Sequence, residues 1–521
     1  MMFFLLFACE SKFTADIIYE GQFYADAYTT HSALAIREGI VVATDEAALE
    51  ALAKDQFPQQ IEGVIFPGFH DSHTHLLAGS FVMDKCLMVG VSSMNVILDK
   101  VETYAQSDPT APWVVGYGWI FTLTENPSGV ALDTIVPNRP AAIFDSSGHA
   151  VLVNSKAMAM AGIDANTEVP EGGIIVKDEN GNPTGLLQES AIELISPLML
   201  SAFDDSALSE NLLRQIEQFK QAGITRISEI LAVPGVNIGR PWIFTQLDEA
   251  GLLDIRVDYY IPAFRESDLV QIGELSQYSS SKVRFAGVKL WVDGSSGSGQ
   301  SWSLEASAVD SDFYGAHYLD ADGLLPFVKA AEEDGYQLKL HVNGDAAVRA
   351  ALDAFERYTE QNGPLVQQHV LDHLVLIDDS DYDRISNLDL IASMQPAHAL
   401  VGAFGEQADH WSDGRFEDTW DLARVIDEDI TLALGTDWPV WPTVDLMVNL
   451  NTAIESLGPK GIPIETAINA YLSDWDAFPP RGCLHVGCVA DFTVFESDPY
   501  LTEDLSELEI EYVVLSDGHD K

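Results

Sequence analysis

The stretch Pro67-Gly68-Phe69-His70-Asp71-Ser72-His73-Thr74-His75 is the most informative part of this sequence. A β-rich run leads into it, and it ends on two histidines separated by one residue. Alternate residues of an extended chain share one face, so the side chains of His73 and His75 can reach one metal ion together. The pair alone is weak evidence, because a chain of 521 residues with 13 histidines can contain this spacing by chance.

Further apolar or β-branched runs follow this stretch and alternate with amphipathic helical patterns. We expect strands at 224–230, 255–261, 283–292, 337–342, 373–377, 388–394 and 431–434. The patterns at 208–222 and 324–334 predict helices between them. Together with the strand that leads into His70, these units predict an α/β fold with a TIM (β/α)8 barrel. The stretch from about 80 to 205 delays the second strand, so we interpret it as an insertion after the first barrel strand.

Chemically informative residues occur where the predicted strands end. In a barrel of this kind, the C-terminal ends of the strands face the active site. His341 and Asp437 lie at such ends, the sixth predicted strand carries His373, and Lys289 lies inside a strand of core residues. A buried ammonium is costly unless it is paired or chemically changed. Nitrogen and oxygen ligands from several strand ends therefore predict a metal site.

Motifs along nearly the whole chain carry a resemblance to a known family. They are Pro67–His75, Gly148-His149-Ala150 with Asn154-Ser155, Gly185–Glu189, Lys289 with Asp293-Gly294, His341 with Gly344-Asp345, Gln395-Pro396, Gly435-Thr436-Asp437 and Val489–Phe492. With these motifs the chain resembles the amidohydrolase superfamily, and within it the amidohydrolase 3 branch that includes N-substituted formamide deformylases.

The resemblance implies a role for each metal-site residue. His73, His75 and Asp437 would bind a first metal ion, and His341 and His373 a second. Lys289 would be carbamylated by carbon dioxide and bridge the two ions. Zinc suits these ligands best, although other divalent metals fit as well. A single ion remains an alternative if Lys289 is unmodified, and the lysine would then form a salt bridge to a barrel carboxylate.

The implied reaction is hydrolysis of a non-peptide carbon–nitrogen bond, in an amide of the N-formyl or N-acyl kind. Asp437 would act as general base and then general acid on a small-molecule substrate. His149, Glu229, Trp291 and Gln395 are weaker candidates for substrate binding, and His398 and Asp345 for orienting ligands. A deaminase, a lactone or ester hydrolase, and a non-catalytic binding relative are the alternatives.

The resemblance also accounts for the β-rich ends of the chain. Residues 14–66 and 481–521 would close into a small β-sandwich beside a barrel that spans 67–480 with its insertion. A homodimer is expected. The first 13 residues end in Leu6-Phe7-Ala8-Cys9, like a bacterial lipoprotein signal without a basic start. Two locations therefore remain as alternatives. The protein is either exported with a lipid anchor at Cys9, or it stays in the cytoplasm.

The net charge of the chain limits the classes of partner that it can bind. The chain has 81 acidic against 27 basic residues, a formal net charge of −54. Such a surface repels phosphates, so nucleic acid and anionic lipid are excluded as partners. It suits salty surroundings, where repulsion between carboxylates is screened.

Cys483 and Cys488 could pair, but we expect free thiols.

Overall fold

The computed structural model describes residues 14–400, 415–472 and 482–516, except 27, 54–55, 122, 171, 234–235, 309, 503–504 and 506–507. The predicted signal segment and Cys9 lie outside the described residues. Among the helices that are described, none is long and apolar enough to cross a membrane.

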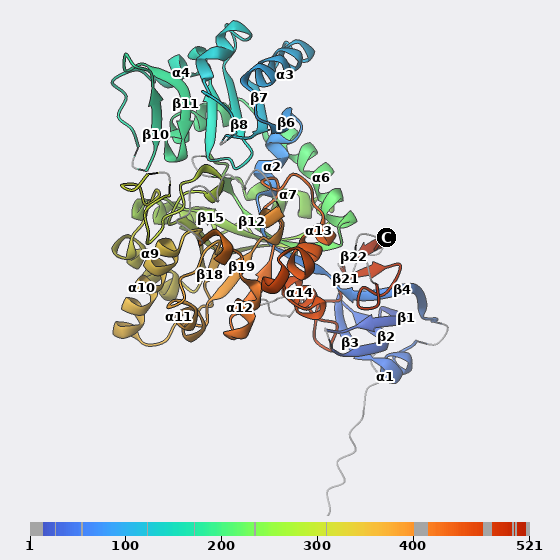
Figure 1. The fold of residues 1–521 in the computed structure, drawn as a ribbon. Helices are drawn as coiled ribbons and strands as arrows, with labels where there is room; N and C mark the ends of the chain where they lie inside the picture. The colour runs from blue at the N-terminus through green and yellow to red at the C-terminus, as the bar shows by residue number, and fades with distance from the viewer. Residues whose placement is uncertain are drawn as a thin grey trace, which may run out of the picture. The chain divides into compact units, whose positions relative to one another are not determined.

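The centre of the chain is an eight-stranded parallel sheet that is nearly closed into a barrel (Figure 1). In chain order its strands are β5 (Phe69–Thr74), β12 (Ile224–Ile230), β15 (Arg256–Pro262), β16 (Val283–Trp291), β17 (Gln337–Val342), β18 (Val370–His373), β19 (Ile391–Met394) and β20 (Thr431–Leu434). A parallel bridge between Thr74 and Trp438 links the first strand to the segment after the last. The predicted TIM-type α/β fold is confirmed.

Helices follow most of the barrel strands. They are α6 (Asp205–Gln221), α7 (Trp242–Glu249), α8 (Leu269–Leu275), α9 (Ala321–Asp334), α10 (Asp345–Asn362), α11 (Tyr382–Asn387), α12 (Leu422–Asp427), α13 (Leu446–Asn451) and α14 (Ile464–Tyr471). The two helices expected from the pattern are α6 and α9. Asp204 caps α6 by accepting from Ala207 N, and Asp320 caps α9 by accepting from Gly323 N.

The sixth barrel strand differs from its prediction. The apolar run 373–377 predicted a strand, but β18 ends at His373 instead of beginning there. The backbone of His373 and Leu374 turns into the left-handed region, with φ of 76° and 47°. Leu376 N then donates to Asn343 O at 3.0 Å, outside the barrel ladder. The run 374–377 is therefore a buried connection, and the strand consists of the four residues 370–373.

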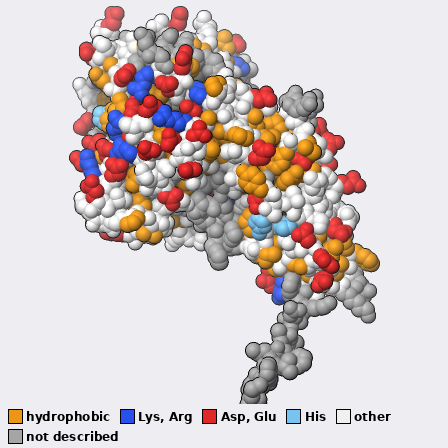
Figure 2. Space-filling view, turned by 60° about the horizontal axis from the view of Figure 1, so that its bottom comes forward, with side chains coloured by type: hydrophobic (Ala, Val, Ile, Leu, Met, Phe, Trp, Pro, Cys, Tyr) orange, Lys and Arg blue, Asp and Glu red, His pale blue; other side chains and the backbone are white. Residues whose placement is uncertain are grey.

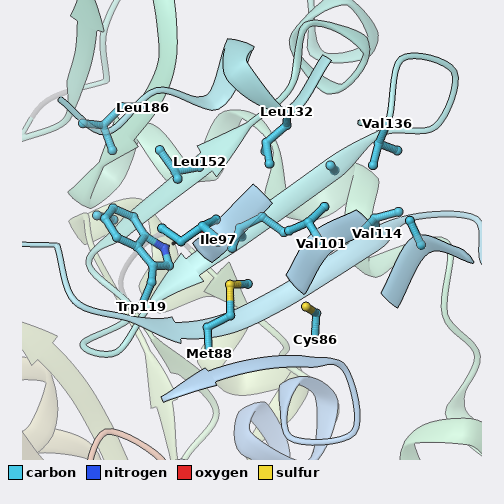
Figure 3. Close-up of a cluster of buried hydrophobic side chains, with 14 residues drawn as sticks. Cys86, Met88, Ile97, Val101, Val114, Trp119, Leu132, Val136, Leu152 and Leu186 are labelled. Carbon is cyan, nitrogen blue, oxygen red and sulfur yellow. Dashed lines mark hydrogen bonds between the residues drawn. The ribbon is translucent and has the colours of Figure 1, made fainter. Parts of the chain in front are cut away.

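The segment between β5 and β12 begins with α2 (Leu76–Val82) and then forms a sheet of its own. Its strand order is β10-β11-β9-β8-β7-β6. The strands are β6 (Cys86–Val91), β7 (Val114–Trp119), β8 (Ala141–Asp145), β9 (Ala150–Val153), β10 (Ile174–Lys177) and β11 (Pro183–Gln188), with the helices α3 (Met94–Ser107) and α4 (Ser155–Ala161). Met88, Ile97, Val101, Trp119 and Leu152 pack into its own hydrophobic core (Figure 3).

The two ends of the chain pair in one six-stranded sheet of order β22-β21-β4-β1-β2-β3. Its elements are β1 (Ile17–Tyr24), β2 (Thr30–Arg37), β3 (Ile40–Thr44), α1 (Asp45–Glu50), β4 (Gln59–Pro67), β21 (Phe492–Phe495) and β22 (Ile510–Val514). Strand β21 runs antiparallel to β4, which joins the C-terminal segment to the N-terminal one. Phe23, Leu34, Ile65 and Phe492 pack on this sheet. The expected meeting of the β-rich ends is therefore observed.

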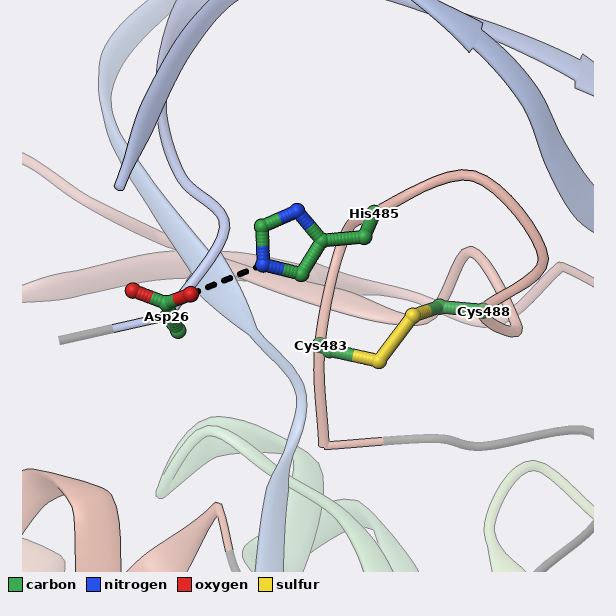
Figure 4. Close-up of a disulfide and its surroundings, with 4 residues drawn as sticks. All are labelled: Asp26, Cys483, His485 and Cys488. Carbon is green, nitrogen blue, oxygen red and sulfur yellow. Dashed lines mark hydrogen bonds and ion pairs between the residues drawn. A yellow bond between two sulfur atoms is a disulfide. The ribbon is translucent and has the colours of Figure 1, made fainter. Parts of the chain in front are cut away.

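The prediction of free thiols at Cys483 and Cys488 is wrong, because these residues form a disulfide (Figure 4). The four residues between them turn back, with Cys488 N donating to His485 O at 3.0 Å, and the two Cα atoms lie 5.9 Å apart. That distance is within the range that a disulfide spans. His485 also contacts Asp26, Nε2 to Oδ2, at 2.7 Å. Cys86 is a buried free thiol.

The surface is strongly acidic, and its basic residues are mostly paired. Figure 2 shows red acidic side chains across the face in view, with blue Lys and Arg side chains among them. Arg384 is the best-connected example, because it forms ion pairs with Asp353, Glu356 and Asp381. The negative net charge therefore arises because Asp and Glu residues outnumber the Lys and Arg residues.

Candidate active site

A cavity of about 220 Å³ opens at the C-terminal ends of the barrel strands. All six side chains predicted to hold a metal line it. They are His73 and His75 from the end of β5, Lys289 from β16, His341 from β17, His373 from β18 and Asp437 after β20. These residues are scattered over the sequence, and the parallel barrel brings them to one end.

Three of these groups lie close enough to share one ion. Ligand atoms of His73, His373 and Asp437 lie within 4.8 Å of one another. Asp437 Oδ1 is also 3.2 Å from His75 Nε2 and 3.5 Å from His73 Nε2. The His341 and His373 rings are 4.4 Å apart between centroids. Imidazole nitrogens and carboxylate oxygens at such distances suit a divalent transition metal.

Unpaired buried atoms support this fit. Within the described residues, Nε2 of His73 and Oδ1 of Asp437 are buried without a hydrogen-bond partner, and they lie 3.5 Å apart. Such atoms are costly to bury unless something else binds them. An ion between His73 Nε2 and Asp437 Oδ1 would give both atoms a partner, so the residues present fit a metal.

The protonation states are those of metal ligands. Burial lowers the pKa of His73 to about 4, and it lowers the pKa values of His341 and His373 well below the usual range. These imidazoles are therefore neutral at pH 7. Burial alone would raise the pKa of Asp437, but the neighbouring histidines hold it below its ordinary value. Asp437 is therefore ionised.

Lys289 forms an ion pair with Asp372 deep in the barrel. Burial is the main cause that lowers the pKa of Lys289, to about 8. The salt bridge to a barrel carboxylate, which the sequence left open as the alternative to carbamylation, is thus present in this structure. Asp372 Oδ1 also lies 2.7 Å from Lys339 Nζ and 3.0 Å from His73 Nδ1.

Asp372 and Lys339 were not predicted as site residues, although the pattern of β17 indicates the lysine. Lys339 precedes His341 by two residues in β17, and alternate residues of a strand share a face. This spacing places Lys339 on the same face of β17 as His341. Asp372 adjoins His373 in the chain, but its direction depended on where β18 ends.

Two amide side chains orient metal-site histidines. Gln395 Oε1 lies 2.8 Å from His373 Nδ1, and Asn343 Nδ2 lies 2.8 Å from His341 Nε2. Gln395 was expected to bind substrate, but it is absent from the described lining of the cavity. Its observed contact is with His373, behind the site. Asn343 was not predicted as a site residue.

His149 reaches the cavity from the loop between β8 and β9. Its Nδ1 lies 2.6 Å from Glu189 Oε2, and its ring centroid lies 5.6 Å from that of His341. Burial alone would lower the pKa of His149, but the Glu189 carboxylate outweighs it and the pKa is raised. The insertion therefore adds a histidine, held by a buried carboxylate, to the barrel site.

The other sequence candidates are placed differently. Glu229 Oε2 and Oε1 accept from Leu76 N at 2.6 Å and Leu77 N at 3.0 Å, so Glu229 caps α2 and is not brought to the described lining of the cavity. Trp291 lines the cavity and stacks on Phe264. His398 lines it too, with Nε2 3.8 Å from Asp437 Oδ2.

Asp345 lies away from the described lining of the cavity. It forms an ion pair with Arg415 and accepts from Leu304 N at 2.9 Å. This carboxylate holds a loop and does not contact any of the predicted ligands through a hydrogen bond among the described residues. The remainder of the cavity wall is largely apolar, with Ile120 and Phe121 from the insertion and Val440 and Trp441 from the segment after β20.

Relatives in several organisms match most of the chain. The protein LONG AFTER FAR-RED 3 of Arabidopsis thaliana is 28% identical over 82% of this chain and 75% of its own. The Bacillus subtilis protein YtcJ is 28% identical over 87% and 88%. The N-substituted formamide deformylase of Arthrobacter pascens is 24% identical over 90% and 91%.

Solved structures share the fold. An uncharacterized metal-dependent hydrolase from Pyrococcus horikoshii superposes with a TM-score of 0.75 and 19% identity, over 94% of this chain and 99% of that one. A second, from Pyrococcus furiosus, gives 0.70 and 21% over 92% and 99%. The model of the amidohydrolase family matches residues 62–516. The chain therefore belongs to the amidohydrolase family of metal-dependent hydrolases.

Proposed function

We propose that this chain hydrolyses the carbon–nitrogen bond of an N-formyl or N-acyl amide, at a zinc centre held by His73, His75, His341, His373, Asp437 and a carbamylated Lys289. The observation that carries the proposal is the convergence of all six side chains on one cavity. The 24% identical N-substituted formamide deformylase supports the choice of bond.

A divalent ion in this site would supply an acidified water and polarise the carbonyl of the substrate. Asp437 is the residue placed to move the proton. Its Oδ1 and Oδ2 lie among His73, His75 and His373, and it is ionised, so it can accept a proton from water. The same oxygen can then give that proton to the leaving nitrogen, which must be protonated to depart as an amine.

His149 is the residue best placed to bind the carbonyl oxygen from the insertion side. Glu189 engages its Nδ1, so Nε2 is the ring nitrogen left for the substrate. The apolar walls at Ile120, Phe121 and Trp441 support an aryl or alkyl group on the amide nitrogen. These contacts would orient the substrate, while water is excluded from the apolar side.

The test is hydrolysis of N-benzylformamide and N-benzylacetamide by metal-loaded protein. We expect turnover that is lost on chelation and restored by zinc. Asp437→Asn should retain bound metal and lose activity by about 10²–10⁴-fold, the contribution typical of a general base. Asp429→Asn, an exposed position at the other end of β20, serves as the control and should keep full activity.

Comparison with benzyl formate separates the amidase from an ester hydrolase. We expect the amide to be turned over with the larger kcat/KM after each is divided by its uncatalysed rate. Turnover of the ester alone would contradict the proposed bond type while leaving the metal site intact. Zinc binding without turnover of any amide, ester or aminopurine would instead support a binding relative.

A further inference from the structure

Two lysines share one carboxylate inside the barrel. Asp372 forms an ion pair with Lys289 and lies 2.7 Å from Lys339 Nζ, and all three side chains are at most 1% exposed. Asp372 also lies 3.0 Å from His73 Nδ1. We refer to Lys289, Lys339, Asp372 and His73 as the lysine cluster. With a neutral His73, two ammonium groups and one carboxylate give the cluster one net positive charge.

The two lysines differ in what they can reach. Lys289 lines the cavity, whereas Lys339 is absent from the described lining. Lys339 Nζ is instead held by Asp372, by Ser393 Oγ at 3.5 Å and by the Tyr260 ring at 5.5 Å. A small molecule that enters the cavity therefore meets Lys289 and not Lys339.

Carbamylation of Lys289 requires the loss of its ammonium. The ammonium first releases a proton to solvent, and the nitrogen lone pair then bonds to the carbon of carbon dioxide. One carbon–oxygen π bond breaks, its electron pair goes to oxygen, and a second proton leaves the nitrogen. The product is an anion, so Asp372 loses its ion pair with Lys289 and gains a negative neighbour.

An uncompensated buried carboxylate would oppose this reaction strongly. We propose that Lys339 is the positioning residue that makes it feasible, because Lys339 remains as the counter-ion of Asp372 when Lys289 becomes an anion. Asp372 then stays ionised and continues to hold His73. The cluster changes from one net positive to one net negative charge, which favours uptake of divalent cations. The inference rests on the carbamylated Lys289 of the proposed function.

The test measures the carbamate directly. Wild type and Lys339→Met are incubated with ¹³C-labelled bicarbonate and zinc, the carbamate carbon is detected by NMR, and bound zinc is counted by elemental analysis. Lys339→Met leaves Asp372 paired with Lys289, so it should fold. We expect it to need at least about tenfold more bicarbonate for half-occupancy, because the modification would orphan Asp372. Its zinc content should fall in parallel.

Three further variants sharpen the result. Lys339→Arg keeps the charge and should retain the carbamate. Lys282→Met removes another buried lysine, which donates to Leu253 O, and should match wild type. The double variant Lys339→Met/Asp372→Asn removes both partners and should regain the carbamate that Lys339→Met lacks. It also serves as the test if the single variant does not fold.

Equal carbamate in wild type and Lys339→Met, or none in the double variant, would overturn the proposal. So would wild type that binds zinc and shows no carbamate at any bicarbonate concentration. Amide hydrolysis is assayed on the same samples. Wild type that cleaves the amide without a carbamate would reject the carbamylated Lys289 and the role of Lys339 but keep the proposed amide hydrolysis. Carbamate without cleavage would keep the role of Lys339 and reject the proposed hydrolysis.

Discussion

His373 Nδ1 lies 2.8 Å from Gln395 Oε1 in the buried space behind the metal site. The contact fixes which nitrogen of His373 carries the hydrogen, because Oε1 can only accept. Nε2 is then the nitrogen left to bind metal. Gln395 also donates from Nε2 to Ser393 O at 3.2 Å, so its amide cannot turn over without losing both bonds.

Gln395→Leu should therefore weaken metal binding. Outer partners of ligating histidines typically account for about 10–100-fold in affinity. We expect a loss in that range when zinc is titrated against a competing chelator. Gln395→Glu retains an acceptor for Nδ1 and is the matched control, with a smaller loss. Unchanged affinity in Gln395→Leu would show that His373 is oriented by other contacts.

Glu229→Ala should reduce stability and spare substrate binding. Glu229 accepts from the backbone N–H groups of Leu76 and Leu77, which would be left buried without partners. Each unsatisfied group costs about 1–3 kcal/mol. We expect a lower free energy of unfolding by denaturant and an unchanged KM. A raised KM with unchanged stability would instead restore Glu229 to the substrate site.

The contrast between Glu229 and the metal-site histidines shows what the sequence could predict. A parallel barrel forces its strand ends together, so locating strands was enough to group His73, His341 and Asp437. The direction of one side chain depends on strand register, and a shift of one residue moves it to the other face. Ser228 contacts His70, whereas its neighbour Glu229 points to α2. Predicted strand ends do not carry that precision.

Side-chain contacts such as Asp372–Lys339 could not be predicted from the sequence for a second reason. Asp372 and Lys339 lie on adjacent strands, and the register of β17 and β18 places Asp372 beside His341, two residues beyond Lys339. The Cys483–Cys488 disulfide depends on a turn that the spacing of the two cysteines does not specify. Both features were determined by backbone geometry, which residue patterns describe only in outline.

The Cys483–Cys488 bond should be detectable as a mass difference of two hydrogens between non-reduced and reduced protein. It closes a short loop, so its removal in Cys483→Ser/Cys488→Ser should cost about 2 kcal/mol of the free energy of unfolding. Because disulfides persist in oxidising compartments, an intact bond in protein taken from its native cells would favour export over a cytoplasmic location. Two free thiols at these positions would argue for the cytoplasm.

The ionised Asp26 should stabilise the protein, and acid should remove this contribution by protonating the carboxylate. Burial alone would raise the pKa of Asp26, but bonds from Tyr28 N, Thr29 N and His485 hold it below its ordinary value of 3.8. A folded-state pKa below the unfolded one stabilises the protein at higher pH, and this contribution is lost as pH falls through the folded-state pKa. Asp26→Asn should be less stable than wild type at pH 7, with the difference shrinking below about pH 4.

The measurement for Asp26 is the free energy of unfolding at several pH values, for wild type and variant. Glu62→Gln, at an exposed position of β4, controls for the removal of one carboxylate. A difference between wild type and Asp26→Asn that stays constant from pH 7 to pH 3 would contradict the role given to the carboxylate.

Salt should stabilise the protein, because the net charge of −54 makes repulsion between carboxylates the dominant long-range force. From about 0.1 M to about 1 M KCl the Debye length falls from about 10 Å to about 3 Å, which screens that repulsion. Local ion pairs act in the opposite direction, since Arg384 stabilises Asp353, Glu356 and Asp381 at low salt. We expect the free energy of unfolding of wild type to rise with KCl, and the cost of Arg384→Gln to shrink. A fall in wild-type stability would show that the paired cations outweigh the repulsion, and a flat response would contradict a salt-adapted surface.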